Sequence, residues 1–175
     1  DPESAQTKQF IASIFETLID CRDDGSYVLN LPYFDYPTGL TMTVDDKWQA
    51  LFGLPRRKPD DELTQAYMNL ALAVQRVTEE VVKRLAASAL SMTGSTNLVM
   101  AGGVALNCVA NGRLLADGTV KSLWIQPAAG DAGGAVGAAF AMWHIGMDQP
   151  RTPLLPDGMS NAYLGPSYGQ REIEG

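Results

Sequence analysis

The chain has 175 residues, of which 46% are hydrophobic and 19% are charged, which excludes a disordered tail or a fibrous protein and predicts a soluble domain with a sizeable core. Thirteen basic and twenty acidic residues give a net charge of -7, which argues against nucleic acid as a partner. No stretch approaches eighteen consecutive apolar residues, so neither a membrane span nor a membrane partner is expected.

The first part of the chain predicts one helix and two short extended pieces. Between residues 4 and 20 the apolar residues recur at helical spacing, so we expect an amphipathic helix before the turn at 23–25. Residues 27–31 and 33–36 then read as short extended segments joined by a proline.

Two further helices are expected before residue 95. Asp45 or Asp46 is positioned to cap a short helix that runs to about Phe52. A long helix starts near Pro59 and is closed by Gly94. Its length would be about 45 Å at the usual rise per residue, and we expect it to be a spine packed on a sheet. Its apolar stripe consists of Leu63, Tyr67, Leu70, Val74, Val77, Val81 and Leu85.

The last ordered part alternates strands and helices. We expect strands at 97–101 and 122–126, each followed by a helix, at about 104–116 and 132–146. Both strands are continuous apolar runs, which is typical of parallel strands that are buried on both faces. The pattern predicts an α/β arrangement, and beyond Gly146 the proline, glycine and serine content indicates a linker.

Glycines at the ends of both strands are the clearest functional signal. Each strand breaks at glycine and turns into a small-residue helix, which leaves backbone N–H groups available for phosphate, nucleotide or metal. Gly102 and Gly103 would let a ligand approach the backbone closely. Asn107 would lie about one turn into the following helix and bond a ribose or phosphate. The alternative is a tight strand-to-helix turn that Asn107 caps.

Asp131 follows the second strand and lies between glycines. A carboxylate there can bind a hard or borderline cation, which in turn would bridge phosphate oxygens. The alternative is a helix N-cap, since aspartate is among the preferred capping residues. His144 is the single histidine, so neither a complete zinc site nor a serine-histidine triad can be built from this chain.

Several other reactive side chains are expected to be structural. Cys21 and Cys108 read as reduced thiols of a cytoplasmic protein, with Cys108 a small buried residue at a helix start. Glu79 and Glu80 are expected on an exposed face of the long helix. The start of the chain has no signal sequence and no initiator methionine, which suggests an excised fragment.

A series of short segments resembles the NodU/CmcH-type O-carbamoyltransferases, over about residues 10 to 170. Two of these segments, the Gly102 motif and the Asp131 motif, are long enough to be specific. The matching segments are residues 33–36, 39–41, 51–53, 63–65, 77–82, 101–112 and 125–135.

The resemblance implies a longer protein with two domains. An amino-terminal domain of the actin/Hsp70/sugar-kinase fold, related to the tRNA threonylcarbamoylation protein TsaD, would precede a YrdC-like domain. Residues 1–148 would form the second, ribonuclease H-like subdomain of the first domain, a mixed sheet flanked by helices that include the long spine. Residues 149–175 would lead to the YrdC-like domain. ATP and carbamoyl phosphate would give a carbamoyl-adenylate, whose carbamoyl group passes to a hydroxyl of a sugar or antibiotic-like acceptor.

The resemblance also assigns residues to the nucleotide and the metal. Gly102, Gly103 and Asn107 would contact the nucleotide. Asp131 would complete a divalent metal site, with iron expected and magnesium or manganese as alternatives. The paired histidines that supply the other metal ligands in this family are absent from this sequence.

Asp46 and Lys47 resemble a pair that approaches the ribose in TsaD-like proteins, although a helix cap also accounts for Asp46. Because the first phosphate-binding half and the acceptor domain are missing, we expect these 175 residues alone to be inactive. Two other function classes stay open: a sugar kinase or Hsp70-like ATPase subdomain, and a binding or assembly module.

Overall fold

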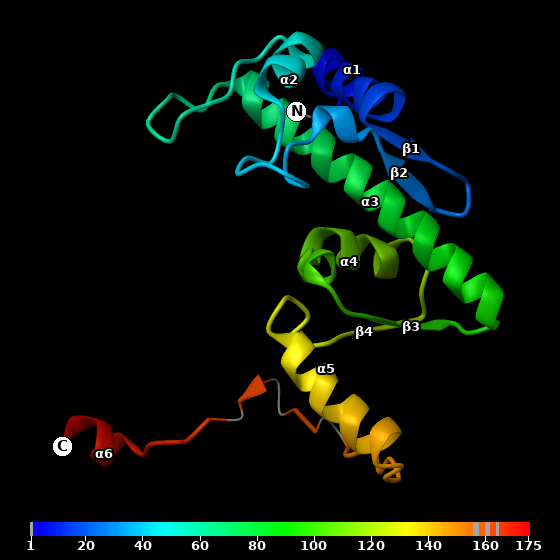
Figure 1. Cartoon of the computed structure of the whole chain (residues 1–175), viewed down its shortest axis with the longest axis vertical. Coiled ribbons are helices and arrows are strands. Elements are labelled where there is room, and N and C mark those ends of the chain that lie inside the picture. Colours follow the sequence, from blue (N-terminus) through cyan, green and yellow to red (C-terminus); the bar gives the residue numbers. More distant parts are fainter. Residues whose placement is uncertain (1, 156–157, 160–161, 164) are drawn as a thin grey trace. The chain divides into compact units, whose positions relative to one another are not determined.

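The computed structural model describes residues 2–155, 158–159, 162–163 and 165–175 (Figure 1). Pro156 and Leu164 of the expected linker lie outside these residues. The chain divides into two compact units, which are described separately below. Unit 1 comprises Asp1–Leu98 with Val109–Ser122, and unit 2 comprises Val99–Cys108 with Leu123–Gly175.

Helix α1 (Ala5–Ser13) opens unit 1 at a side-chain cap. The backbone N–H of Thr7 donates to the hydroxyl of Ser4 at 3.1 Å, which satisfies one of the free donors of the first turn. A π-helical turn, η1 (Ile14–Leu18), continues the helix. The predicted helix is therefore present but ends at Leu18, because the next residues form a strand.

Strands β1 (Ile19–Cys21) and β2 (Tyr27–Leu29) form an antiparallel hairpin. The first predicted extended piece corresponds to β2. The second is reduced to one isolated bridge between Phe34 and Thr43, because the residues before it form a short 3-10 turn, η2 (Leu31–Tyr33).

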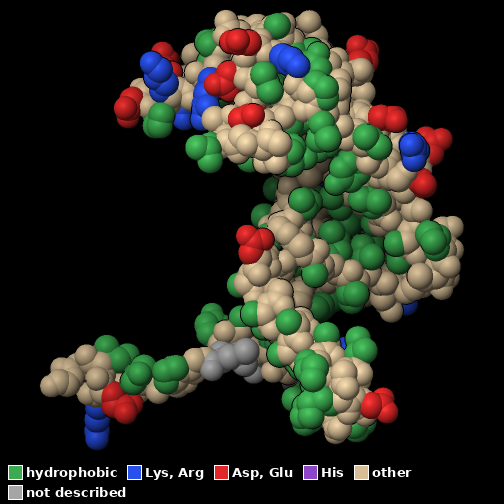
Figure 2. Space-filling view, viewed as in Figure 1, with side chains coloured by type: hydrophobic (Ala, Val, Ile, Leu, Met, Phe, Trp, Pro, Cys, Tyr) green, Lys and Arg blue, Asp and Glu red, His purple; other side chains and the backbone are tan. Residues whose placement is uncertain are grey.

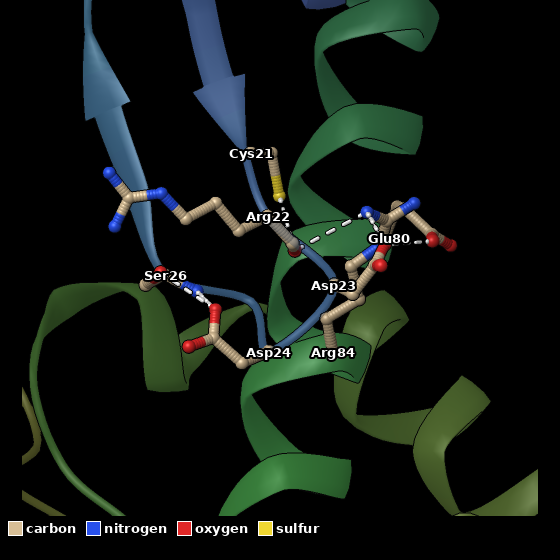
Figure 3. Close-up of polar contacts among 7 residues, drawn as sticks. All are labelled: Cys21, Arg22, Asp23, Asp24, Ser26, Glu80 and Arg84. Carbon is tan, nitrogen blue, oxygen red and sulfur yellow. Dashed lines mark hydrogen bonds and ion pairs between the residues drawn. The ribbon is translucent and has the colours of Figure 1, made fainter.

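The turn of this hairpin packs directly on helix α3 (Gln65–Thr93) (Figure 3). The guanidinium of Arg84 donates to the backbone carbonyl of Arg22 at 3.3 Å and to the carboxylate of Glu80 at 2.7 Å. Gly25 has φ +80°, and a Cβ atom there would lie 2.4 Å from the backbone nitrogen of Leu85. The close approach of turn and helix therefore requires glycine at this position.

Helix α3 ends as predicted, with Gly94 in the left-handed conformation. Its start differs, because Thr64 is the N-cap and the proline and acidic residues at 59–62 precede the helix. Val77 and Val81 are buried, whereas Val74 and Leu85 of the predicted stripe are exposed. The buried face of α3 is wider than the predicted apolar stripe, because α3 contacts helix α1, the β1–β2 turn and Arg113 of α4 and not one sheet.

The core of unit 1 lies between α1, α3 and a short helix, α2 (Asp45–Phe52). Phe52 packs edge-on against Phe10, with ring centroids 5.4 Å apart. The N-cap of α2 is Val44, without a side-chain hydrogen bond, so the predicted cap at Asp45 or Asp46 is wrong. Both acidic residues occupy the first turn instead, where they still interact favourably with the helix dipole.

Strands β3 (Asn97–Met100) and β4 (Ser122–Ile125) form a second two-stranded sheet, with helix α4 (Cys108–Ala116) between them in sequence. Successive hydrogen bonds advance along both strands together, from Lys121 to Thr96 and from Gln126 to Met100, so the strands are parallel. This confirms the α/β class. The predicted burial on both faces is wrong: neither strand has a buried residue, since the sheet is only two strands wide.

Unit 2 continues with helix α5 (Gly133–Ala141) and a π-helical turn, η4 (Met142–Gly146), in agreement with the predicted helix. A short helix, α6 (Gln170–Glu174), lies near the end of the chain. Within the described residues, no helix is both long enough and apolar enough to cross a membrane.

We predict that Gly25→Ala destabilises the protein by about 3 kcal/mol, because the substitution adds a steric clash with α3 to the cost of a left-handed alanine. Gly118→Ala is the matched control. Gly118 has φ +74° but no atom within 4 Å of a built Cβ, so it should lose only about 1 kcal/mol. Urea unfolding measures the free energy of unfolding of both variants. Equal losses would show that the close approach of the turn to α3 adds nothing to the cost of the substitution.

Candidate functional site

The two glycine motifs meet in unit 2. The backbone N–H of Gly102 donates to the carbonyl oxygen of Ala129 at 2.7 Å, and that of Gln126 donates to the carbonyl oxygen of Met100 at 3.1 Å. The segment after β3 therefore lies beside the segment after β4. The carboxyl ends of neighbouring parallel strands are the common location of ligand sites in α/β sheets.

Gly102 has a backbone conformation that only glycine adopts readily, with φ 97° and ψ 160°. A Cβ atom at Gly102 or Gly103 would meet no atom within 4 Å, and both residues are exposed. The backbone is thus open on the side where a side chain would otherwise project. A ligand could approach it closely at this point.

The sequence predicts Asn107 about one turn into a helix. In the structure it lies between two helical segments. A 3-10 turn, η3 (Gly103–Leu106), comes first, and Asn107 is its C-cap and directly precedes α4. Its N–H donates to the carbonyl oxygen of Val104 at 3.0 Å, and the residue is half-buried.

Asp131 is exposed on the turn that leads into α5. The N-cap of α5 is Ala132, and no side chain caps this helix, so the capping alternative for Asp131 is wrong. The turn is tight: a Cβ at Gly133 would lie 2.1 Å from the carbonyl oxygen of Ala128. Asp131 therefore projects from a turn whose backbone is fixed by glycine.

The described residues do not form a complete metal centre. Among them, no group of three or more histidine, cysteine, aspartate or glutamate side chains is arranged to hold a metal ion. Asp131 supplies one carboxylate, and His144 is occupied elsewhere, with its Nδ1 3.0 Å from the carbonyl oxygen of Gln149. A carboxylate is a suitable ligand for a divalent ion, but one carboxylate alone does not make a metal centre, so any further ligands would have to come from a bound phosphate or from outside the described residues.

Asp46 belongs to unit 1, whereas the glycine motifs belong to unit 2. It is exposed in the first turn of α2. The neighbouring Lys47 donates to the carbonyl oxygen of Pro32 at 2.8 Å and lies 5.6 Å from the centre of the Tyr33 ring. Cys108, expected to be buried, is exposed at the first residue of α4.

Glu79 is another residue whose burial differs from the prediction. It was expected on an exposed face, but its side chain is only 7% exposed. Its carboxylate accepts hydrogen bonds from Arg76 at 3.0 Å and Gln75 at 3.0 Å, both on α3. Arg113 on α4 forms an ion pair with the same carboxylate at 3.0 Å. Arg113 allows the charge of Glu79 to be buried. It lies 34 positions later in the chain, so the residues near Glu79 give no sign of this partner.

A second ion pair joins the same two regions of unit 1. The ammonium of Lys83 lies 2.6 Å from the carboxylate of Asp117. A hydrogen bond from Lys83 and, to a smaller extent, hydrogen bonds from Thr119 lower the pKa of Asp117 to about 2. Lys83 and Asp117, together with Glu79 and its arginine partners, line a cavity of about 240 Å³. Every carboxylate that lines the cavity is paired with a basic side chain. We therefore interpret the cavity as part of the ionic contact between α3 and the region of α4, and not as a ligand site.

Residues 5–140 match the family described as "Carbamoyltransferase N-terminus". The chain belongs to this carbamoyltransferase family. The match includes both glycine motifs, Asp46 and Asp131.

Three curated proteins are similar to this chain. An uncharacterized protein, sll1178, of Synechocystis is 51% identical over 95% of this chain and 27% of its own length. Nodulation protein NolNO of Sinorhizobium fredii is 33% identical over 92% of the chain and 22% of its own length. Nodulation protein NolO of Bradyrhizobium diazoefficiens is 37% identical over 66% of the chain and 20% of its own length. The chain thus spans about a quarter of the length of these relatives.

We predict that Glu79→Ala destabilises unit 1 by about 3 kcal/mol, because it leaves two guanidinium groups without their shared carboxylate. The value is at the lower end for a buried ion pair, since the Arg113 side chain is half-exposed. Glu80→Ala removes a more exposed pair with Arg84 and should cost about 0.5 kcal/mol. Chemical denaturation compares the two, and similar losses would contradict the role of burial.

Proposed function

We propose that this segment supplies one wall of the nucleotide site of an ATP-dependent O-carbamoyltransferase. The observation that carries the proposal is the hydrogen bond from Gly102 to Ala129, which brings together the two glycine-containing loops of a carbamoyltransferase-family chain. The N–H of Gly102 is used in this hydrogen bond, but the open backbone at Gly102 and Gly103 lets a nucleotide approach the loop closely. Asn107 would provide an amide for the ribose or phosphates.

In the proposed reaction, carbamoyl phosphate and ATP give a carbamoyl-adenylate, and the carbamoyl group then passes to a hydroxyl of a small acceptor. The residues of this segment bind and orient the nucleotide. Positioning of this kind lowers the barrier by holding the reacting groups in a productive geometry. The acceptor would bind outside these 175 residues.

The proposal also covers the fold and the limits of the segment. Residues 1–148 would be the ribonuclease H-like second subdomain of an actin/Hsp70/sugar-kinase fold, and 149–175 the connection to a YrdC-like domain. The spine helix α3 and the parallel pair β3 and β4 support this assignment. The phosphate-binding half would come from elsewhere in the protein, so we propose that the isolated segment is inactive.

Asp46 and Asp131 have supporting roles in this proposal. Asp46 would approach the ribose from the first turn of α2. Asp131 would contribute one oxygen ligand to a divalent ion, iron or else magnesium or manganese, whose other ligands lie outside the segment. When bound, such an ion would neutralise phosphate charge.

The nucleotide role is tested by Gly103→Ala in a full-length protein that carries this segment. A methyl group at Gly103 meets no protein atom, so the fold should be unchanged. A nucleotide against the loop would collide with it, and we expect ATP affinity to fall at least about tenfold, or 1.4 kcal/mol. Isothermal titration calorimetry measures the affinity, and thermal unfolding verifies the fold.

The matched control is Gly112→Ala, since Gly112 is equally open but lies within α4. Its ATP affinity should equal that of the unchanged protein. Unaltered affinity in Gly103→Ala would overturn the nucleotide role of the loop. ATP hydrolysis that proceeds at the same rate with and without carbamoyl phosphate would instead favour a kinase or Hsp70-like ATPase.

The metal role predicts that Asp131→Asn in the same full-length protein lowers both bound metal and carbamoyl transfer, while the thermal unfolding temperature stays the same. An exposed carboxylate that caps no helix has no structural task to lose. Metal analysis of the purified protein gives the stoichiometry. Asp148→Asn, on another exposed residue, is the control, and full metal content in Asp131→Asn would refute the assignment.

A further inference from the structure

Helix α5 has an apolar sequence and no buried residue. Its nine residues are glycine, alanine, valine and phenylalanine, and all are at least partly exposed. The following turn η4 adds exposed hydrophobic side chains, with Phe140 56%, Trp143 50% and Ile145 82% exposed. Hydrophobic side chains gather over α5 in Figure 2. A helix that is hydrophobic all round is typical of the interior of a larger protein.

The parts of the parallel strands β3 and β4 that belong to unit 2 are uncovered in the same way. Val99 of β3 is 73% exposed and Trp124 of β4 is 45% exposed. Parallel sheets normally have both faces covered, and two strands alone are marginally stable. The exposure of α5 is therefore part of a wider lack of covering layers in unit 2.

Seven of the nine residues of α5 are glycine or alanine, and Gly133, Gly137 and Ala141 form one row of small residues along the helix. A Cβ at Gly137 would meet no atom within 4 Å. Nothing among the described residues therefore accounts for glycine at this position. Small residues at this spacing allow another helix to approach closely.

We propose that α5 and η4 form a docking surface for an apolar helix, which buries them in the full-length protein. This helix comes from the part of a full-length family protein that lies outside these 175 residues. The chain covers only 20–27% of its curated relatives, and the family match runs through α5 to residue 140. The apolar surface thus lies in a region shared with proteins about four times longer. The proposal rests on family membership and is independent of the nucleotide role.

The test compares Gly137→Leu in two proteins: the 175-residue chain, and a protein of the relatives' length that carries these residues in the matching position. In the chain alone, the leucine meets open space and the thermal unfolding temperature should not fall. In the long protein it would collide with the covering helix, and the unfolding temperature should fall by several degrees. Gly112→Leu, at an open position between polar neighbours, should be tolerated in both.

Hydrogen exchange of α5 amides gives a second readout that needs no variant. We expect exchange at least about a hundredfold slower in the long protein than in the chain alone. Equal exchange in both proteins, or Gly137→Leu tolerated in the long protein, overturns the proposal. Protection that appears in the chain alone and rises with its concentration would assign the surface to a second copy, which also overturns it.

Discussion

Unit 1 depends on the packing of helix α1 against helix α3. Ala73 has no exposed surface, and Phe10 and Val77 are buried in the same core. A polar link lies at one end of this contact, where Asn69 donates to the side chain of Gln6 at 2.8 Å. The hairpin turn approaches α3 so closely that it needs glycine. Helix α3 is therefore the element on which α1, α2 and the hairpin of unit 1 pack (Figure 1). Arg113 of α4 also contacts α3.

The contact between α3 and α4 combines apolar and ionic interactions. Leu114 and Ala110 are buried, while Glu79 and Lys83 of α3 pair with Arg113 and Asp117. Of these side chains only Glu79 is buried; a buried charge adds little net stability compared with apolar packing, but removing its partner is costly. The contact is consequently sensitive to single substitutions. Helix α4 directly follows Asn107, so this ionic contact anchors the helix that continues from the proposed nucleotide loop.

Unit 2 is organised by backbone geometry rather than by a hydrophobic core. The Gly102 to Ala129 hydrogen bond joins the ends of two parallel strands, and Gly133 permits the tight turn before α5. The same unit exposes most of its large apolar side chains. Both features support the proposals that the loop binds a nucleotide and that another part of a longer protein covers the apolar surface.

The sequence by itself missed strand β1 and helix α6, which lie in segments predicted as a helix and a linker. It determined the other main helices, the strand-to-helix alternation after residue 96, the end of α3 at Gly94, the α/β class and the two glycine motifs. These depend on local properties: hydrophobic period, capping and the conformational freedom of glycine. Only the tertiary structure decided that Glu79 is buried, that Val74 and Leu85 are exposed, and that Asp131 caps no helix. Burial of Glu79 depends on Arg113, 34 residues away, and the exposure of β3, β4 and α5 depends on how few of the described residues pack around them. Contacts between residues far apart in the chain do not change the local hydrophobic pattern, so they cannot be predicted from it.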